Sequence, residues 1–481
     1  MIIQAEHFYW LSALFITIEL CGILAAMHAL FTVRTSQGAV AWAVSLVFMP
    51  VLTLIPYLIF GRNKFGAYIK ARRQVDNEMH QVTQKIDWRN WIKEVITGSP
   101  DQRYESVRAF YKLTGMPLLA NNKIDLLVNG QQTFDTIFAA LRHAKKVVLM
   151  EFFIVNDDAL GKELQKELID CANRGVKVYF LYDRVGSIRL PGQYIATLKK
   201  AGVYVGSFST RTSFFNRFQW NFRCHRKITI IDGEIGFVGG HNVGIEYLGK
   251  KPPLAPWRDT HIVLQGPIVT CLQETFAEDW FWASGTLPEL LFQTQFPTDG
   301  VACQSLPSGP ADEQETCSLF FVEALNAAKK RIWITSPYFV PDEAVWSALQ
   351  LAVLRGVDVR ILLPSRKDHL FVYLASVLYA MEAVKMGVRV FNYTEGFTHQ
   401  KVVLIDDDIT AIGSANLDNR SFRLNFEIMV LTISERFTQK VEEMLVNDFA
   451  VSTEKSLADS NKYSFFYRFG LGIARLLSPV L

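Results

Sequence analysis

The chain has 481 residues, of which 50% are hydrophobic and only 20% are charged, and its net charge is +3. Its length exceeds that of one ordinary domain, so we expect two or three domains. The apolar composition is typical of a membrane-attached protein, and the small net charge excludes an argument for nucleic acid from charge alone. The six cysteines are scattered without a Cys-x-x-Cys pair, a spacing typical of reduced or buried thiols.

Two apolar runs begin the chain. Residues 8–31 are interrupted only by Glu19 and His28, and residues 39–60 contain no charge. Each run is long enough to cross roughly 30 Å of hydrocarbon as a helix, so residues 1–61 are predicted to form a transmembrane hairpin. A cleaved signal peptide fits poorly, because no basic segment precedes the first run and a second run follows it.

Five basic residues with no acid among them follow the hairpin, at the beginning of a segment, residues 62–110, that we interpret as a juxtamembrane linker. They are Arg62, Lys64, Lys70, Arg72 and Arg73. Because positively charged flanks stay in the cytoplasm, we expect everything after Gly61 to be cytoplasmic. A buried helical hairpin in a soluble core is the alternative.

The tail, residues 456–481, mixes basic and apolar side chains. From Lys462 onward it contains Arg468 and Arg475 but no acid. This pattern is typical of an amphipathic helix that lies in the interface of a membrane with anionic lipid. A terminal helix docked on the protein core is the other interpretation, and the sequence leaves both open.

The part between linker and tail alternates predicted strands and helices, and its landmarks occur twice in the same order. Ala-Lys-Lys precedes an apolar strand at 144–146 and at 328–330, and Arg-Gly-Val occurs at 174–176 and at 355–357. Such a repeat predicts a duplicated α/β domain, with the boundary in the polar stretch 297–314. We therefore expect one domain over 111–298 and another over 299–455.

Each half also contains the pattern His-x-Lys-x-x-x-x-Asp. The six residues, which we take as the candidate catalytic set, are His225, Lys227, Asp232, His399, Lys401 and Asp406. Ten residues after each Asp, a turn of small residues ends in an asparagine: Asn242 and Asn416. Two copies with the same internal spacing predict two half-sites of one composite active centre.

Each motif is predicted to lie on a strand, where residues i and i+2 share a face. The His and Lys of a motif should therefore point the same way. Asp232 and Asp406 have the opposite parity, so we expect them to pair with backbone or with a basic side chain. A carboxylate that could fix a histidine tautomer follows each motif, namely Asp259 and Glu427.

This set of residue types suits a phosphodiester. Two ammonium groups can neutralise a phosphate and the charge that grows in its transition state, and two amides can add donors. The candidate phosphate ligands are Lys227, Lys401, Asn242 and Asn416. One imidazole can attack phosphorus, and the other can act as general acid and base. No metal or other cofactor is required, because the lysines carry the positive charge.

These residues resemble the signature of the phospholipase D superfamily, and longer segments resemble the bacterial cardiolipin synthases. The segments are residues 56–61, 114–117, 257–261 (Trp-Arg-Asp-Thr-His), 336–341, 417–427 and 477–481. The resemblance implies an α/β fold of duplicated phospholipase D-like α-β-α sandwich domains with pseudo-twofold symmetry, behind a two-helix transmembrane hairpin.

The resemblance also implies a phosphatidyltransferase that joins two phosphatidylglycerol molecules and releases glycerol. It implies that His225 is the nucleophile and that His399 is the acid and base. Each histidine would be held by the carboxylate of the opposite half, His225 by Glu427 and His399 by Asp259. Ser414 has no counterpart in the first half, where a glycine stands.

The expected partners are phosphatidylglycerol and other anionic lipids of a bacterial inner membrane, with no nucleic acid; the oligomeric state is left open. An aromatic and basic segment, residues 214–223, could lie at the level of the lipid headgroups, bind single-stranded nucleic acid, or be a packed loop. A phospholipase D-type hydrolase, a nuclease and a non-catalytic lipid-binding scaffold are the alternative functions.

Overall fold

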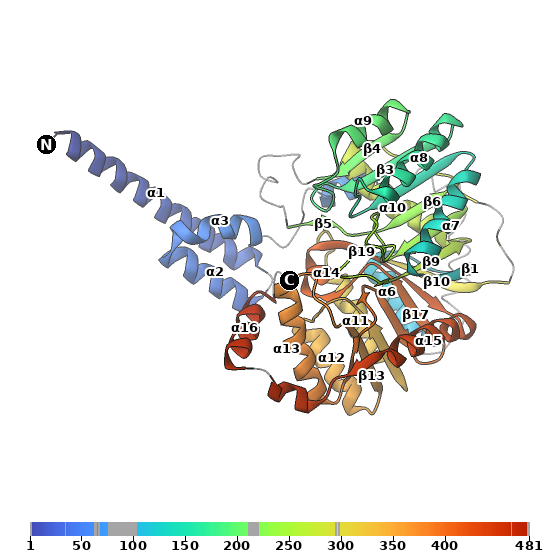
Figure 1. Cartoon of the computed structure of the whole chain (residues 1–481). Helices are drawn as coiled ribbons and strands as arrows, with labels where there is room; N and C mark the ends of the chain where they lie inside the picture. Colours follow the sequence, from blue (N-terminus) through green and yellow to red (C-terminus); the bar gives the residue numbers. More distant parts are fainter. Residues whose placement is uncertain are drawn as a thin grey trace. The chain divides into compact units, whose positions relative to one another are not determined.

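The computed structural model describes residues 2–33, 35–61, 65, 68–75, 103–209, 221–293, 296, 299–462 and 464–478. They belong to two compact units, Met1–Ile69 with Thr210–Phe222 and Lys70–Ser209 with Arg223–Leu481, which Figure 1 draws together. Most of the basic linker and most of the aromatic segment 214–223 lie outside the described residues, so the expectations for them stay predictions.

The smaller unit begins with a long apolar helix. Its first helices are α1 (Ile2–Thr32), α2 (Ser36–Phe48) and α3 (Pro50–Phe60). Within α1, Tyr9–Thr32 is long and apolar enough to cross a membrane, as the sequence predicts for its first run. Gly22 lets α1 and α2 approach closely, because a Cβ there would lie 2.5 Å from the carbonyl oxygen of Leu46.

The second apolar run differs from the expectation of one spanning helix over 39–60. Met49 (φ −141°, ψ 51°) separates α2 from α3, and Pro50 begins the new helix because its ring fixes φ and removes the N–H group. With 13 and 11 residues, neither helix alone covers roughly 30 Å at about 1.5 Å per residue. The hairpin is therefore confirmed only in its first helix.

The larger unit is built on one mixed sheet. Its strands in the first half of the sequence are β1 (Leu118–Val128), β2 (Val147–Phe152), β3 (Lys177–Asp183), β4 (Tyr204–Phe208), β5 (Arg223–Cys224), β6 (Ile228–Ile231), β7 (Ile235–Gly239) and β9 (Thr260–Gln265). In the second half they are β10 (Val301–Ser308), β11 (Arg331–Thr335), β13 (Asp358–Pro364), β14 (Arg389–Tyr393), β16 (Val402–Ile405), β17 (Ile409–Gly413), β19 (Asn425–Ile433) and β20 (Ser452–Glu454). Two-residue strands outside this sheet are β8 (Trp257–Arg258), β12 (Phe339–Val340), β15 (Phe397–Thr398) and β18 (Leu417–Asp418).

The two halves repeat the same strand order. From the centre outward it is β1-β9-β7-β6-β2-β3-β4 in the first half and β10-β19-β17-β16-β11-β13-β14 in the second. The outer three strands of each series run parallel. β1 pairs antiparallel with β10, with Leu118 opposite Gln304, and so joins the halves. This is the duplicated α/β fold that the repeat predicts; where one half ends and the next begins stays a prediction.

Helices cover both faces of the sheet (Figure 1). They are α7 (Asn129–His143), α8 (Ala159–Asn173), α9 (Gly192–Lys200) and α10 (Ile268–Ser284), then α11 (Thr316–Ala327), α12 (Glu343–Leu354), α13 (Leu370–Met386), α14 (Asn419–Arg423) and α15 (Glu435–Ala450). One core holds Phe276 of α10 and Val441 of α15 and extends across both halves. The other face has a separate core in each half, around Leu164 of α8 and Leu349 of α12. The unit is therefore an α-β-α sandwich.

Two further helices, one before the duplicated region and one after it, also pack on this unit. α6 (Arg103–Thr114), which we expected in the linker, lies against α11 and β10 and buries Phe110. α16 (Phe465–Leu476) follows the 3-10 helix Leu457–Lys462 and packs on α13, burying Leu471 and Ala474. One face of the tail is therefore docked on the core, which was one of its two interpretations.

Candidate active site

The two motif histidines lie where the chain crosses between the halves. His225 follows β5, which pairs in parallel with the beginning of β19, and the chain then joins β2 of its own half through β6. His399 follows β15, which pairs in the same way with β8 of the first half. Backbone hydrogen bonds continue these contacts, from His225 N to Phe426 O at 2.9 Å and from His399 N to Arg258 O at 2.8 Å. The motif strands β6 and β16 begin three residues after His225 and His399. The prediction that each motif begins inside a strand was therefore wrong.

Each histidine contacts a carboxylate of the opposite half. His225 Nδ1 lies 2.9 Å from both Glu427 oxygens, and His399 Nδ1 lies 2.7 Å from Asp259 Oδ2. Both carboxylates are fully buried. An Nδ1–H donated to a buried carboxylate leaves Nε2 as the free, basic atom of the neutral ring. The cross-pairing agrees with what the resemblance implied.

Glu427 accepts hydrogen bonds from several further side chains. Ser414 Oγ donates at 2.6 Å, Ser421 Oγ at 2.9 Å and Asn425 Nδ2 at 3.1 Å. Burial alone would raise the pKa of Glu427, but His225, Lys227 and Ser414 outweigh it and lower that pKa. Glu427 is therefore held as an anion in one orientation.

The carboxylate of the first half has fewer donors. Asp259 Oδ1 accepts from Thr260 N at 2.8 Å, and the Trp257 indole N–H lies 3.5 Å from Oδ2. Gly240 occupies the position that corresponds to Ser414, and a Cβ there would lie 2.1 Å from Asp259 Oδ1. The glycine is thus required for space, and the two histidine–carboxylate pairs are chemically different.

The motif lysines are buried beside the histidines. Lys227 Nζ donates to His225 O at 2.6 Å, and Lys401 Nζ donates to His399 O at 2.5 Å. Burial lowers the pKa of Lys227 to about 7 and that of Lys401 to about 8, against the pull of the nearby carboxylates. Among the described residues neither ammonium group forms a salt bridge, although both lie near Glu427 and Asp259, and perturbed lysines of this kind are typical of functional sites.

The charged residues of one half contribute to the electrostatic environment of the histidine in the other half. Burial and Lys227 lower the pKa of His225 to about 4, despite Glu427, and Lys401 of the other half also contributes. Burial, Lys401, Lys227 and His225 together lower the pKa of His399 well below its usual value. Both imidazoles are therefore neutral in the empty site near pH 7.

The motif aspartates lie outside this cluster. Asp232 accepts hydrogen bonds from the backbone N–H groups of Lys145, Lys146 and Val147 at 2.7–2.9 Å. Asp406 accepts the equivalent bonds from residues 329–331. Both occupy the left-handed region, with φ of 53° and 50°, in the turn after the motif strand. These contacts to the chain entering β2 and β11 are those of the structural role that their parity predicted, and their place in the candidate catalytic set stays a prediction.

The two candidate asparagines differ in their surroundings. Asn242 Oδ1 accepts from Ile154 N at 3.1 Å, and its Nδ2 donates to the Tyr247 hydroxyl at 3.1 Å. Asn416 is buried, and its Oδ1 has no hydrogen-bond partner among the described residues. The second amide is thus the freer of the two to meet a ligand, and both phosphate-binding roles stay predictions.

Sequence reasoning missed the residue between His and Lys in each motif. Arg226 Nη1 lies 2.6 Å from Asp279 of α10, and Gln400 Nε2 donates to Asp448 of α15 at 2.8 Å. These contacts hold the crossing segments against the helices of the shared core. The available signal was a second internal repeat, because Asp279 and Asp448 each precede an aromatic residue at equivalent points of the two halves.

A buried acidic group lies next to the first histidine. The ligand atoms of Glu151, Cys224 and Asp279 lie within 4.8 Å of one another, a grouping that could hold a metal ion. Arg226 already supplies a positive charge to Asp279, and Cys224 Sγ donates to Glu151. Burial raises the pKa of both Glu151 and Cys224 well above their usual values. The group therefore holds protons, and Cys224 is not a thiolate.

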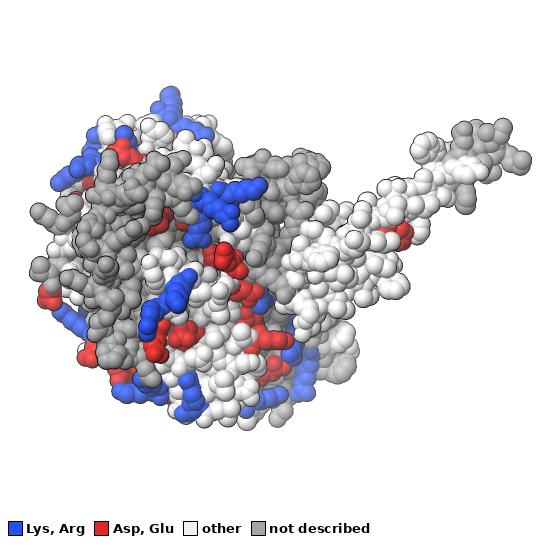
Figure 2. All heavy atoms as spheres, turned by 180° about the vertical axis from the view of Figure 1, so that it is seen from behind, with Lys and Arg blue, Asp and Glu red and all other residues white. Residues whose placement is uncertain are grey.

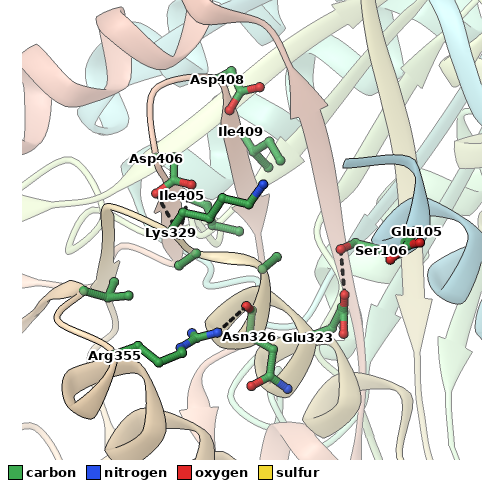
Figure 3. Close-up of a pocket in the computed structure, with 13 residues that line it drawn as sticks. Glu105, Ser106, Glu323, Asn326, Lys329, Arg355, Ile405, Asp406, Asp408 and Ile409 are labelled. Carbon is green, nitrogen blue, oxygen red and sulfur yellow. Dashed lines mark hydrogen bonds between the residues drawn. The ribbon is translucent and has the colours of Figure 1, made fainter. Parts of the chain in front are cut away.

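A pocket of about 640 Å³ lies at the far end of β16 from His399 (Figure 3). It is lined by residues of both charges, among them Lys329, Arg355, Glu323 and Asp406. Arg355 donates to backbone carbonyls and Asp406 accepts from backbone N–H groups, so these two are occupied structurally. This pocket is separate from the histidine cluster.

Comparisons with known proteins agree with this geometry. A family model described as cardiolipin synthase, PLD-like domain, matches residues 137–280 and 321–449, and one described as phospholipase D-nuclease N-terminal matches residues 22–62. Cardiolipin synthase A of Pseudomonas fluorescens strain SBW25 is 60% identical over 97% of both chains, and that of Pseudomonas putida strain GB-1 is 58% identical over 98% of this chain and 99% of its own. The crystal structure of phosphatidylserine synthase from Haemophilus influenzae Rd KW20 matches with a TM-score of 0.59 at 15% identity, covering 78% of this chain and all of that one, which supports the fold.

Proposed function

The chain belongs to the cardiolipin synthases with phospholipase D-like domains, and we propose that it moves a phosphatidyl group from one phosphatidylglycerol to a second, releasing glycerol. It is a phosphatidyltransferase of that family. The observation that carries the proposal is the buried cluster in which each histidine takes its carboxylate from the other half. Two lysines beside that cluster suit one phosphodiester.

In the first step His225 is the nucleophile. Glu427 fixes its Nδ1–H, so the Nε2 lone pair attacks phosphorus and forms a P–N bond. The bond from phosphorus to the headgroup glycerol oxygen breaks, and protonated His399 gives its proton to that oxygen. The products are free glycerol and phosphatidyl-His225.

In the second step His399, now neutral, accepts the proton of a glycerol hydroxyl on a second phosphatidylglycerol. That oxygen attacks phosphorus, the P–N bond breaks, and His225 is restored with cardiolipin as product. The asymmetry between the two carboxylates supports different roles for the two histidines, because Glu427 has three additional side-chain donors, whereas the additional side-chain donor to Asp259 among the described residues is the Trp257 indole N–H at 3.5 Å.

Substrate binding explains how His399 becomes protonated although its pKa is low. In the empty site burial and the two lysines lower the pKa of His399, which would make it a poor acid. A phosphodiester anion between Lys227 and Lys401 offsets the repulsion that these ammonium groups exert on an imidazolium ion. The substrate therefore raises the pKa of the acid that it needs, and binding takes up a proton.

We also propose that the catalytic unit faces the cytoplasm from a bacterial inner membrane, with phosphatidylglycerol and other anionic lipids as its partners. The apolar helix over Tyr9–Thr32 supports membrane attachment. Together α2 and α3 provide a second apolar segment for a multi-pass arrangement. On the face seen in Figure 2, acidic and basic residues are interspersed, which does not favour a nucleic acid substrate.

The test is product analysis with purified protein and defined lipids. Mass spectrometry should find cardiolipin and glycerol from phosphatidylglycerol, and neither His225→Ala nor His399→Ala should form cardiolipin. Phosphatidic acid as the main product would indicate a hydrolase, and cleavage of DNA offered without lipid would indicate a nuclease. Lipid binding without any product would leave a scaffold, and normal turnover in both alanine variants would refute the shared site.

A further inference from the structure

The C-terminal helix α16 has two faces with different surroundings. Its inner face packs on α13, where Leu471 and Ala474 are buried and Arg475 Nη1 lies 3.1 Å from Glu382. Arg475 also lies over the Tyr379 ring, 5.9 Å from its centroid. These contacts fix the rotation of α16 and so determine which side chains point outward.

The outer face of α16 is apolar, and exposed apolar side chains also stand at the beginning of α13, the helix on which α16 packs. The exposed residues, which we call the apolar ledge, are Phe466 (82%), Phe469 (62%), Ile473 (45%) and Leu476 (79%) of α16, with Leu370 (51%) and Phe371 (52%) of α13. Scattered exposed apolar side chains are ordinary, but six large ones on two helices that pack together indicate a surface for a partner or a membrane.

The beginning of α13 lies near residues that adjoin the catalytic cluster. α13 packs on β12, which pairs with β18 directly after Asn416. α13 begins at Leu370, two residues after Asp368, whose carboxylate accepts from the Tyr338 hydroxyl. Further along α13, Ser376 Oγ accepts from Phe339 N. The α13 end of the ledge is therefore the end that we place toward the cluster.

The basic residues near the ledge indicate that its partner is anionic lipid. From Lys462 to the end the chain contains Arg468 and Arg475 and no acid, and Lys367 is exposed next to the beginning of α13. Basic residues at the edge of an apolar helical face are typical of contact with anionic lipid headgroups. The same chain carries a helix able to cross a membrane, so a bilayer is within its reach.

We propose that the apolar ledge inserts into the boundary between headgroups and acyl chains of the substrate membrane and delivers anionic phospholipid to the histidine cluster. The choice of substrate rests on the proposed function, whereas the insertion itself does not. The aromatic side chains fix how deeply the ledge lies in the membrane. Through α13, that depth sets the position of Asp368 and Lys401 relative to the membrane. α16 is then a second membrane contact in addition to α1.

Site-directed spin labelling of the full chain in lipid nanodiscs tests the insertion directly. Cys21 is exposed and the other five cysteines are buried, so Cys21→Ser provides a background with one added label. Phe469→Cys places the label on the ledge. Val446→Cys is the matched control, because Val446 is also an exposed apolar helical residue but lies on α15, across the sheet from α13.

Discs of phosphatidylglycerol and phosphatidylethanolamine should give a Phe469→Cys label that collides with oxygen and is shielded from a water-soluble nickel complex. The control label should show the opposite. A ledge label as open to nickel as the control would refute insertion. A label shielded from both reagents would also refute it, because it would mean contact with protein, either a second copy or another part of this chain.

Activity separates delivery from chemistry. Phe469→Ser with Leu476→Ser should raise the KM for vesicle-borne phosphatidylglycerol by about tenfold or more. Turnover of short-chain phosphatidylglycerol dissolved below its micelle concentration should stay unchanged, as should both activities in Val446→Ser. Equal loss on both substrates, or no loss on either, would overturn the proposal. If the unaltered protein forms no cardiolipin while the label is in lipid, the proposed function is refuted but the insertion of the ledge into the membrane is not.

Discussion

Replacing Glu427 by glutamine tests the central contact of the site with almost no change in volume. The variant removes the negative charge that faces His225 Nδ1 at 2.9 Å. A hydrogen bond to a charged group contributes about 1.5–3 kcal/mol. The new amide also presents hydrogens where Ser414, Ser421 and Asn425 now donate. The serines can turn to accept, but one buried donor without an acceptor costs about 1–3 kcal/mol more.

Together these losses amount to about 2.5–6 kcal/mol, which corresponds to about 10²–10⁴ in the rate of the first step. The assay is rapid-quench detection of phosphatidyl-histidine, followed by the initial rate of cardiolipin formation. Ser421→Ala is the control, because it removes one donor at 2.9 Å but keeps the anion, and we expect a loss of about fivefold. A Glu427→Gln variant within threefold of the unaltered protein, or no slower than the control, would refute the orienting role.

The other predictions concern protonation, the roles of the two histidines, stability and metals. The value of kcat/KM should fall as the pH rises from about 5 to 7, because binding takes up a proton on His399, and fall more steeply near and above pH 7 as Lys227 and Lys401, with pKa values of about 7 and 8, lose their protons; it should also fall below about pH 4 as His225 gains a proton. A profile that rises through pH 9 would contradict this. With a phosphatidyl ester of p-nitrophenol, which needs no acid, His399→Ala should still release nitrophenolate in a burst and accumulate the intermediate, whereas His225→Ala should not; identical behaviour of the two variants would reverse or remove the assignment. Asp232→Ala should lower the free energy of unfolding by about 2–4 kcal/mol, because three backbone donors lose their acceptor, while Ala at the exposed Asp157 should change it little; equal effects in a denaturant titration would argue against the structural role. Treatment with a chelator should leave turnover unchanged, and a loss that added zinc restores would favour a metal mechanism.

The duplicated fold and the residues of the site could be predicted because the sequence contains the landmarks of both in two copies. A chance match to His-x-Lys-x-x-x-x-Asp is easy, but a second copy in the same order of landmarks requires two equivalent structural positions. Strand parity separated Asp232 and Asp406 from the histidines, since alternate residues of a strand point to opposite faces. The rule predicted only that those aspartates face away from the histidines; their contacts with the backbone of residues 145–147 and 329–331 come from the left-handed turns that follow the strands.

Other features depend on contacts that no local pattern contains. The break after β5 exists because Cys224 pairs with Phe426 of the other half, a tertiary contact 202 residues away by chain position, as for His225 and Glu427. Asp279 and Asp448 looked like ordinary helix residues until Arg226 and Gln400 were found against them. The division of the second apolar run at Pro50 was readable in principle, because proline commonly begins a helix, but the absence of charge over 39–60 suggested one span.

The crossing of β5 and β15 between the halves has a consequence for the newly made protein. His225 is synthesised early, yet its carboxylate partner is Glu427, and His399 needs Asp259 from far upstream. A ribosome that has produced only the first half has therefore made His225 without the carboxylate that contacts it. On the proposed mechanism, we expect a fragment that stops short of β19 to transfer no phosphatidyl group, so activity would begin only near completion of the polypeptide.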